Sequence, residues 1–168
     1  MKKLWAPWRM EYIQDSVIPG GKECIFCIGN NSANDRERLI LHRGETAFVM
    51  MNKYPYNNGH LLIAPYRHIA DFNGLTDEEF LEIQQLLGVC IEAMKGCMHP
   101  HGFNIGMNLG QVAGAGVEDH IHYHILPRWS GDTNFLPVFG EVKVISEALE
   151  ATYDKLKEQL VKLMQEAG

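Results

Sequence analysis

Short apolar segments recur along the first three quarters of the chain, and they predict the strands of a β-sheet. Alternating or continuous apolar runs that are bounded by glycine, proline and asparagine are typical of half-buried or buried strands. The segments with this pattern cover residues 39–41, 46–51, 60–65, 103–109 and 120–126. A turn around Arg43 and Gly44 separates the first two segments, so we expect these two strands to pair.

Two helices are predicted by another spacing, in which apolar residues return every three to four positions. Thr76 and Glu79 form a capping box in front of the first helix, which we expect to continue to about Lys95. Ser146 can cap the second helix. The apolar stripe of that helix consists of Leu149, Tyr153, Leu156, Leu160 and Leu163. We expect this stripe to dock on the rest of the domain or on a partner subunit.

Strands that flank one long helix, with another helix at the end, predict an α+β domain built on an antiparallel β-sheet. The 168 residues suffice for one domain with a sizeable core. We divide the chain into an aromatic arm over residues 1–22 that packs on the body, a main domain over 23–144 and a C-terminal helix over 145–168.

Composition and charge restrict the partners of this domain. The chain is 46% hydrophobic and 21% charged, as in an ordinary soluble protein. It has no apolar run of about 18 residues, and its N-terminus lacks the apolar core of a signal peptide, so we expect a cytoplasmic protein without a membrane partner. The net charge of −6 argues against a nucleic-acid polymer as ligand. A small anionic ligand is not excluded, because local hydrogen-bond donors decide its binding.

The most informative motif is the run from His120 to Leu126, in which histidines stand at 120, 122 and 124. Side chains two residues apart lie on one face of a strand, so the three imidazoles should form a row while Ile121, Tyr123 and Ile125 face a core. Imidazole is a nucleophile and a proton carrier near neutral pH, which favours phosphoryl or nucleotidyl transfer. A pH-sensitive surface strand or an accidental metal patch would carry the same pattern.

A segment of small residues lies directly before the histidine run, within residues 108–116. Small residues at 113–116 let the backbone approach a ligand and present N–H groups to it, as in a phosphate-binding turn. A flexible hairpin loop has the same composition.

The four cysteines fall into two groups. Cys24 and Cys27 are separated by two residues and form half of a tetrahedral zinc site, although a plain pair in a reducing compartment would have the same spacing. Cys90 and Cys97 lie in or just after the first predicted helix, where we expect a buried small residue and a bystander.

The histidine run resembles the motif of the histidine triad (HIT) family of nucleotide hydrolases and transferases, in which three histidines alternate with apolar residues. The resemblance extends over roughly residues 4–144. Three further segments are similar to the bacterial diadenosine tetraphosphate phosphorylase-type branch of this family, namely 4–13, 102–110 and 128–135. The resemblance implies a HIT-like fold, an antiparallel sheet with one long and one C-terminal helix, and a homodimer.

The resemblance also implies roles for the three histidines. His122 would attack the α-phosphorus of a dinucleotide and carry the nucleotidyl group. His124 would hydrogen-bond the phosphate and stabilise its developing charge. The backbone carbonyl of His120 would bind the other ring nitrogen of His122 and thereby fix its tautomer.

Nucleotide contacts are implied at several positions. Asn52 and Asn108 match polar contacts to ribose or phosphate, although both can equally cap turns, and Phe48 is a possible wall of an adenine pocket or part of the core. In the glycine-containing loop, relatives carry a glutamine that touches phosphate at the position of Ala115. The loop here is one residue longer, so Gln111 or backbone amides at Gly114 and Gly116 would replace that donor.

Relatives of this kind close a zinc site with a downstream histidine and the first histidine of the triad. Those positions here are His68 and His120, which complete a set of four ligands with Cys24 and Cys27. A structural zinc ion is therefore expected, and His60 is an alternative ligand that is better explained as a residue at the start of a strand, packed near the active site.

Together these features predict an enzyme that cleaves a purine dinucleoside polyphosphate through a nucleotidyl-histidine. With inorganic phosphate as acceptor, diadenosine tetraphosphate would give ADP and ATP, and with water it would give AMP and ATP. The branch resemblance favours phosphorolysis. Hydrolysis of nucleoside phosphoramidates is another enzymatic alternative. A nucleotide-binding sensor without turnover and a zinc-dependent interaction module are the alternatives from other classes.

Overall fold

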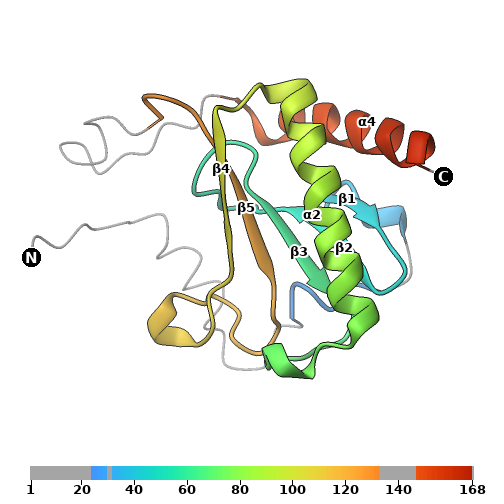
Figure 1. The fold of residues 1–168 in the computed structure, drawn as a ribbon, viewed down its shortest axis with the longest axis vertical. Helices are drawn as coiled ribbons and strands as arrows, with labels where there is room; N and C mark the ends of the chain where they lie inside the picture. Colours follow the sequence, from blue (N-terminus) through green and yellow to red (C-terminus); the bar gives the residue numbers. More distant parts are fainter. Residues whose placement is uncertain (1–23, 30–31, 133–146, 168) are drawn as a thin grey trace, which may run out of the picture.

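The computed structural model describes residues 24–29, 32–132 and 147–167. The sheet in this part of the chain has the strand order β1-β2-β3-β5-β4, and every neighbouring pair is antiparallel (Figure 1). Its strands are β1 (Ile40–Arg43), β2 (Ala47–Met51), β3 (Leu61–Pro65), β4 (Gly102–Gly106) and β5 (Tyr123–Arg128). The expected antiparallel α+β architecture is confirmed. The expected arm over residues 1–22 and the capping residue Ser146 lie outside the described residues.

Two α-helices cover one face of the sheet, α2 (Asp77–Met98) and α4 (Leu149–Ala167), and they pack against each other (Figure 1). Thr76 and Glu79 form the expected capping box at the start of α2. The helix runs three residues beyond the expected end at Lys95 and stops at His99, which adopts the left-handed conformation with φ 49°. The described residues also contain three short 3₁₀ turns, at Ser32–Asn34, Phe72–Gly74 and Gln111–Ala113.

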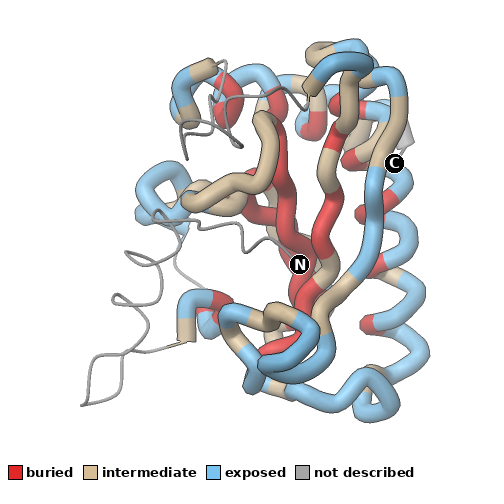
Figure 2. The backbone as a smooth tube through the Cα atoms, turned by 90° about the vertical axis from the view of Figure 1, so that its left-hand side faces the viewer, coloured by how far each residue is buried: buried red, intermediate tan, exposed pale blue. Residues whose placement is uncertain are grey.

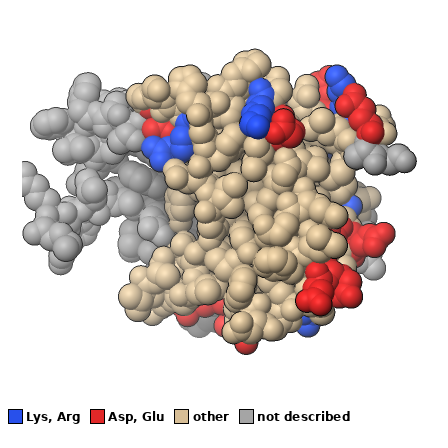
Figure 3. Space-filling model, in the orientation of Figure 1, with Lys and Arg blue, Asp and Glu red and all other residues tan. Residues whose placement is uncertain are grey.

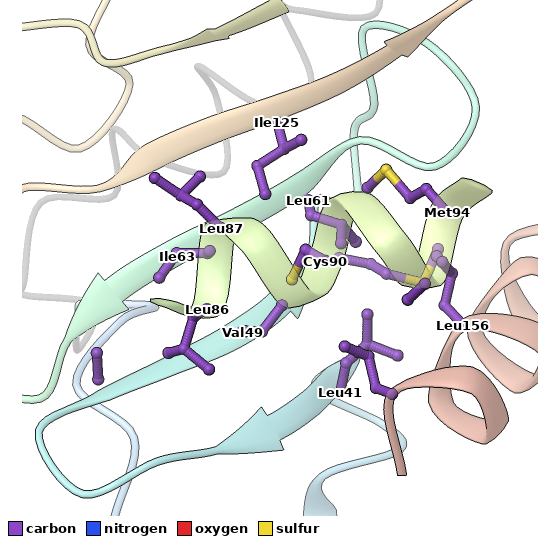
Figure 4. Packing of buried hydrophobic residues seen from close by; sticks show 14 of the residues in the cluster. Leu41, Val49, Leu61, Ile63, Leu86, Leu87, Cys90, Met94, Ile125 and Leu156 are labelled. Atoms are coloured by element: carbon purple, nitrogen blue, oxygen red, sulfur yellow. The ribbon is translucent and has the colours of Figure 1, made fainter. Parts of the chain in front are cut away.

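The main core lies between the helices and this face of the sheet. Strand residues such as Val49, Leu61 and Ile125 point toward α2, as Figure 4 shows. The stripe of α4 docks on the chain's own domain, because Tyr153, Leu156 and Leu160 are buried in the same core. The buried residues lie mainly in the strands, whereas the outer sides of the helices are exposed (Figure 2). No helix in the described ranges is long and apolar enough to cross a membrane.

The opposite face of the sheet carries a second, smaller core. It consists of Phe26, Ile28, Ile40, Phe48, Met50, Leu62 and Ala64. Cross-strand partners share a face, so the pairing of Leu62 with His124 places His124 on this side of the sheet, away from the helices. The register thus separates a hydrophobic face under the helices from a face that carries histidine.

The last two strands differ from the sequence prediction in their limits. β5 begins at Tyr123, so His120 and His122 precede the paired strand, and β4 ends at Gly106 instead of residue 109. β3 itself continues to Pro65, which in this register stands opposite Ile121, but proline has no N–H to donate, and the N–H of Ile121 instead bonds the carbonyl of Ile69 at 2.7 Å. The pair of Gly106 with His124 is the last between β4 and β5.

The turn between β1 and β2 is held by one carboxylate from α2. The side-chain oxygens of Glu82 accept hydrogen bonds from the backbone N–H groups of Glu45, Thr46 and Ala47 and from the Thr46 hydroxyl. Burial works to raise the pKa of Glu82, but these hydrogen bonds outweigh it and lower the pKa. Glu82 therefore anchors the first hairpin to the helix in its ionised form.

We expect the Glu82→Gln variant to lose about 2 kcal/mol of unfolding free energy at pH 7, because an amide cannot accept all of these bonds and its NH₂ group faces backbone N–H groups. A carboxyl with a lowered pKa in the folded state stabilises the fold above its unfolded-state pKa of about 4.3, and this contribution is lost as the pH falls through the folded-state value. The difference between variant and wild type should therefore shrink on acidification.

Urea unfolding at pH 7 and below pH 4 measures both effects. Glu92→Gln is the matched control, since Glu92 lies on the same helix and makes only a surface ion pair with Lys95. Equal stabilities of Glu82→Gln and Glu92→Gln at pH 7 would contradict the anchoring role.

Candidate active site

The site lies on the face of the sheet that the helices leave open. A small pocket there is lined by His122 and His124, by Asn52 at the end of β2, and by Gly114 and Gly116 from the loop before the histidines. A larger cleft of about 920 Å³ adjoins it and shares Asn52 and Gly116 with it. This volume lies in the usual range for small-molecule sites.

The orientation of His122 follows from its backbone contact. Nδ1 of His122 lies 2.8 Å from the carbonyl oxygen of His120. A carbonyl can only accept, so Nδ1 carries the proton and Nε2 keeps its lone pair. Burial lowers the pKa of His122, and its ring is 6% exposed at the edge of the pocket. The Nε2 atom therefore presents the lone pair of a neutral imidazole at the pocket.

His124 belongs to a chain of hydrogen bonds that begins at a backbone amide. The N–H of Tyr56 donates to Nδ1 of His60 at 3.1 Å, and the side-chain amide of Asn52 reaches the same atom at 3.2 Å. His60 therefore carries its proton on Nε2, which lies 2.8 Å from Nδ1 of His124. Since that Nδ1 accepts, the proton of a neutral His124 is on Nε2.

The Nε2 atom of His124 is buried and has no hydrogen-bond partner among the described residues. Burial and, to a lesser degree, the nearby His122 lower the pKa of His124 to about 4, so the ring is neutral at pH 7. The rings of His122 and His124 lie 4.9 Å apart between their centroids. A free donor thus stands beside a free nucleophile, and a bound ligand with an acceptor oxygen would satisfy it.

The structure brings some predicted nucleotide contacts to this pocket and leaves others outside it. Asn52, Gly114 and Gly116 line it. Asn108 instead donates to the carbonyl of Gly114 at 3.3 Å and so braces the loop. Three predicted residues line neither cavity, namely Phe48, Gln111 and Ala115. Phe48 is buried in the smaller core, where it packs against other apolar side chains of this face.

The sequence predicted that His60 starts a strand near the active site, but its hydrogen bond to His124 was missed. Its position does contain a signal: it lies two residues before Leu62, which pairs with His124, and residues two apart share a face. The pairing of β3 with β5 was not known from the sequence, so the contact between the two histidines could not be inferred.

Four side chains form a second cluster behind His122. The ligand atoms of Cys24, Cys27, His68 and His120 all lie within 4.8 Å of one another, as expected from the resemblance. Sγ of Cys24 is 3.5 Å from Nδ1 of His120, and Sγ of Cys27 is 3.3 Å from Nδ1 of His68. In a tetrahedral zinc site, sulfur and nitrogen ligands stand about 3.6 Å apart.

The chemistry of this donor set also fits a metal. Nε2 of His120 lies 2.8 Å from the carbonyl oxygen of Pro65 and must donate to it, so Nδ1 presents a lone pair to the cysteines. Metal-binding histidines are usually oriented by such a bond from their other nitrogen. The cluster can bind a metal ion, and His60, which is bonded to His124, is not part of it.

Comparison with known proteins agrees with this geometry. The HIT domain matches residues 34–131. The chain is 36% identical over 164 residues to AP-4-A phosphorylase of Mycobacterium tuberculosis, covering 90% of this chain and 80% of that protein. It is 29% identical to adenosine 5'-monophosphoramidase of Schizosaccharomyces pombe, covering 62% of this chain and 74% of that protein.

Comparison with solved structures agrees with these sequence matches. A Zn-bound histidine triad family protein from Mycobacterium smegmatis superposes with a TM-score of 0.65 at 22% identity, covering 86% of this chain and 97% of that one. The open-faced sheet, the alternating histidines and these matches lead to one assignment: the chain belongs to the histidine triad family of nucleotide-processing proteins.

Proposed function

We propose that this protein cleaves dinucleoside polyphosphates such as diadenosine tetraphosphate by nucleotidyl transfer through His122. The observation that carries the proposal is the pairing of two free atoms in one pocket, the lone pair on Nε2 of His122 and the buried, unpartnered Nε2–H of His124. The identity to an AP-4-A phosphorylase supports the substrate class.

The reaction has two displacements at one phosphorus atom. Nε2 of His122 attacks the α-phosphorus, a P–N bond forms, and the P–O bond to the departing nucleotide breaks. The Nε2–H of His124 donates to a phosphate oxygen and stabilises the charge that develops there. The acceptor then attacks the same phosphorus, and the P–N bond breaks.

Inorganic phosphate is the acceptor that we propose, so that diadenosine tetraphosphate gives ADP and ATP. The support is the similarity to the AP-4-A phosphorylase of Mycobacterium tuberculosis, which matches 90% of this chain. Hydrolysis, with water as acceptor, would use the same residues. The match to an adenosine 5'-monophosphoramidase keeps phosphoramidate hydrolysis as the second enzymatic candidate, over a smaller share of the chain.

The remaining nucleotide contacts are assigned by their place in the two cavities. Asn52 and the backbone at Gly114 and Gly116 contact phosphate or ribose, since they stand beside the histidines. The adjoining cleft, which has apolar walls at Met50 and Leu62, takes the purine base. Asn108 acts through the loop that it braces.

Zinc is the metal that we propose for the cluster, because two cysteines and two histidines form a ligand set typical of structural zinc. When bound, the ion would fasten the segment of Cys24 and Cys27 to His68 and His120 and supply no reaction step. His120 then serves as a metal ligand through its side chain and as an orienting group through its carbonyl.

Two further expectations stay predictions. One is the homodimer, and we place its interface along α2 and β4, because Leu81 and Ile105 are exposed and charged side chains are scarce in the middle of the face that Figure 3 shows. The cytoplasmic location agrees with the thiols of Cys24 and Cys27, which are unpaired with each other and suit a reducing compartment.

The first prediction concerns products. Incubated with diadenosine tetraphosphate and inorganic phosphate, the protein should release ADP and ATP, and the phosphate should be required. His122→Ala should lose at least 1,000-fold in turnover because it lacks the nucleophile, while a calorimetric titration should show that it still binds nucleotide.

AMP and ATP formed with or without phosphate would identify a hydrolase, and undiminished turnover by His122→Ala would overturn the covalent route. A protein that binds nucleotide without turning over dinucleoside polyphosphate or phosphoramidate would be a sensor.

The second prediction concerns His60. In His60→Leu, His124 loses the donor that fixes its tautomer, so Nε2 is no longer held as the protonated atom. We expect kcat to fall about 10- to 100-fold, with little change in KM, as for other orienting partners. His101→Leu is the matched control, since His101 is exposed and bonds Ser130 away from the site. A kcat in His60→Leu equal to that of the control would refute the orienting role.

The third prediction concerns the metal. Purified protein should contain about one zinc per chain, and Cys27→Ser should lose most of it and melt at a lower temperature, because a structural zinc site contributes to folding. Cys97→Ser should keep its zinc, since Cys97 is outside the cluster. Elemental analysis and thermal unfolding give both readouts, and wild-type protein that binds no added zinc would exclude the site.

A further inference from the structure

The two residues between the cysteines of the metal cluster both reach the active site. The N–H of Cys27 bonds the carbonyl of Cys24 at 2.9 Å, which closes a tight turn and turns Ile25 and Phe26 in different directions. Ile25 is 44% exposed and borders both cavities, whereas Phe26 is 1% exposed and lines only the small pocket. The segment that supplies two thiols to the cluster thus also supplies part of the pocket wall.

Phe26 lies directly on the nucleophile. Its ring centroid is 4.5 Å from that of His122, with 30° between the planes, and 5.3 Å from that of His120. This places one aromatic ring against both a ligand of the cluster and the attacking imidazole. Ring contacts at this distance are favourable and depend on the relative orientation of the two rings.

The hydrogen bond of His122 does not by itself fix the plane of its ring. The bond from Nδ1 to the carbonyl of His120 holds one edge, and rotation about that contact would carry Nε2 away from the pocket. Phe26 occupies the space on one side of the ring. Its own position is set by the smaller core, where it packs with residues of β2 and β3 such as Met50 and Leu62.

We propose that Phe26 is a positioning residue through which the Cys24–Cys27 turn, when fastened in the metal cluster, holds the His122 ring for attack. The inference rests on the proposed nucleophilic role of His122. Two connections then run from the cluster to His122: the backbone carbonyl of His120 sets the tautomer, and the ring of Phe26 sets the plane. A displacement of the nucleophile by about 1 Å costs up to 100-fold in rate, so loosening the turn should reduce kcat while the cleft still binds nucleotide.

The test compares Phe26→Leu, Cys27→Ser and the double variant with wild type. Phe26→Leu removes the planar ring and should keep its zinc, lower kcat at least tenfold and change KM less than threefold. Cys27→Ser should lose zinc and show a similar loss of kcat. The double variant should be no slower than Cys27→Ser alone, because both changes release the same ring.

Two measurements make the test independent of turnover. Elemental analysis shows whether Phe26→Leu keeps its metal. The side-chain ¹⁵N signals of His122 in NMR spectra report on its ring directly, and we expect them to be shifted or broadened in both Phe26→Leu and Cys27→Ser. Phe103→Leu is the matched control, since it removes a phenyl ring on the helix-covered face and should leave the His122 signals as in wild type.

The proposal is overturned if Phe26→Leu has a kcat within twofold of wild type and unshifted His122 signals, or if the losses in the double variant multiply. If wild type turns over no dinucleoside polyphosphate, the proposed function fails, and the His122 signals alone decide the positioning role. Should circular dichroism show that Phe26→Leu is unfolded, Phe26→Met replaces it with the same expectations, since methionine fills a similar volume without a plane.

Discussion

The pairing register between β3 and β5 is the constraint on which the site depends. Leu62 stands opposite His124, and this fixes every second residue of both strands on the same face. A slip by one residue would bury the imidazoles under α2 and expose Ile125, which fills the main core. All five residues of β3 are apolar and buried, so the alternation that decides which face His124 takes lies in β5, where the neighbouring Ile125 fills the main core.

Groups that do not titrate set the protonation pattern of the site. The carbonyl of His120 places the proton of His122 on Nδ1, and the N–H of Tyr56 places that of His60 on Nε2. The carbonyl of Pro65 places the proton of His120 on Nε2. Backbone groups keep their donor or acceptor character at every pH, so His122 and His124 each present a defined nitrogen to the pocket before a ligand arrives. Such preorganisation is what electrostatic catalysis requires.

The sequence predicted which helices and strands form better than it predicted where each of them begins and ends. Periodicity located the first three strands and both helices because these depend on local spacing, and the capping box at Thr76 marked the start of α2 within one residue. The late start of β5 was not predictable, because it goes with a long-range bond from the N–H of Ile121 to the carbonyl of Ile69 that local spacing does not reveal. The contact of His60 with His124 was hidden because the pairing of β3 with β5 was not known from the sequence. The Cys–His cluster was expected from the family resemblance, whereas the spacing of Cys24 and Cys27 alone gave only half of it.

The two outer strands of the sheet differ in what their free edges can do. Along β1, the hydroxyl of Tyr153 donates to the carbonyl of Ile40 and the ammonium group of Lys157 to that of Leu41, so α4 already satisfies these acceptors. β4, by contrast, is an exposed strand whose partner lies on one side, at β5. A strand from another molecule could therefore pair with the free edge of β4, but at the opposite edge of the described sheet, along β1, it would meet α4. Growth of the sheet by addition of copies would stop after one step, and α4 thus protects the fold against open-ended aggregation.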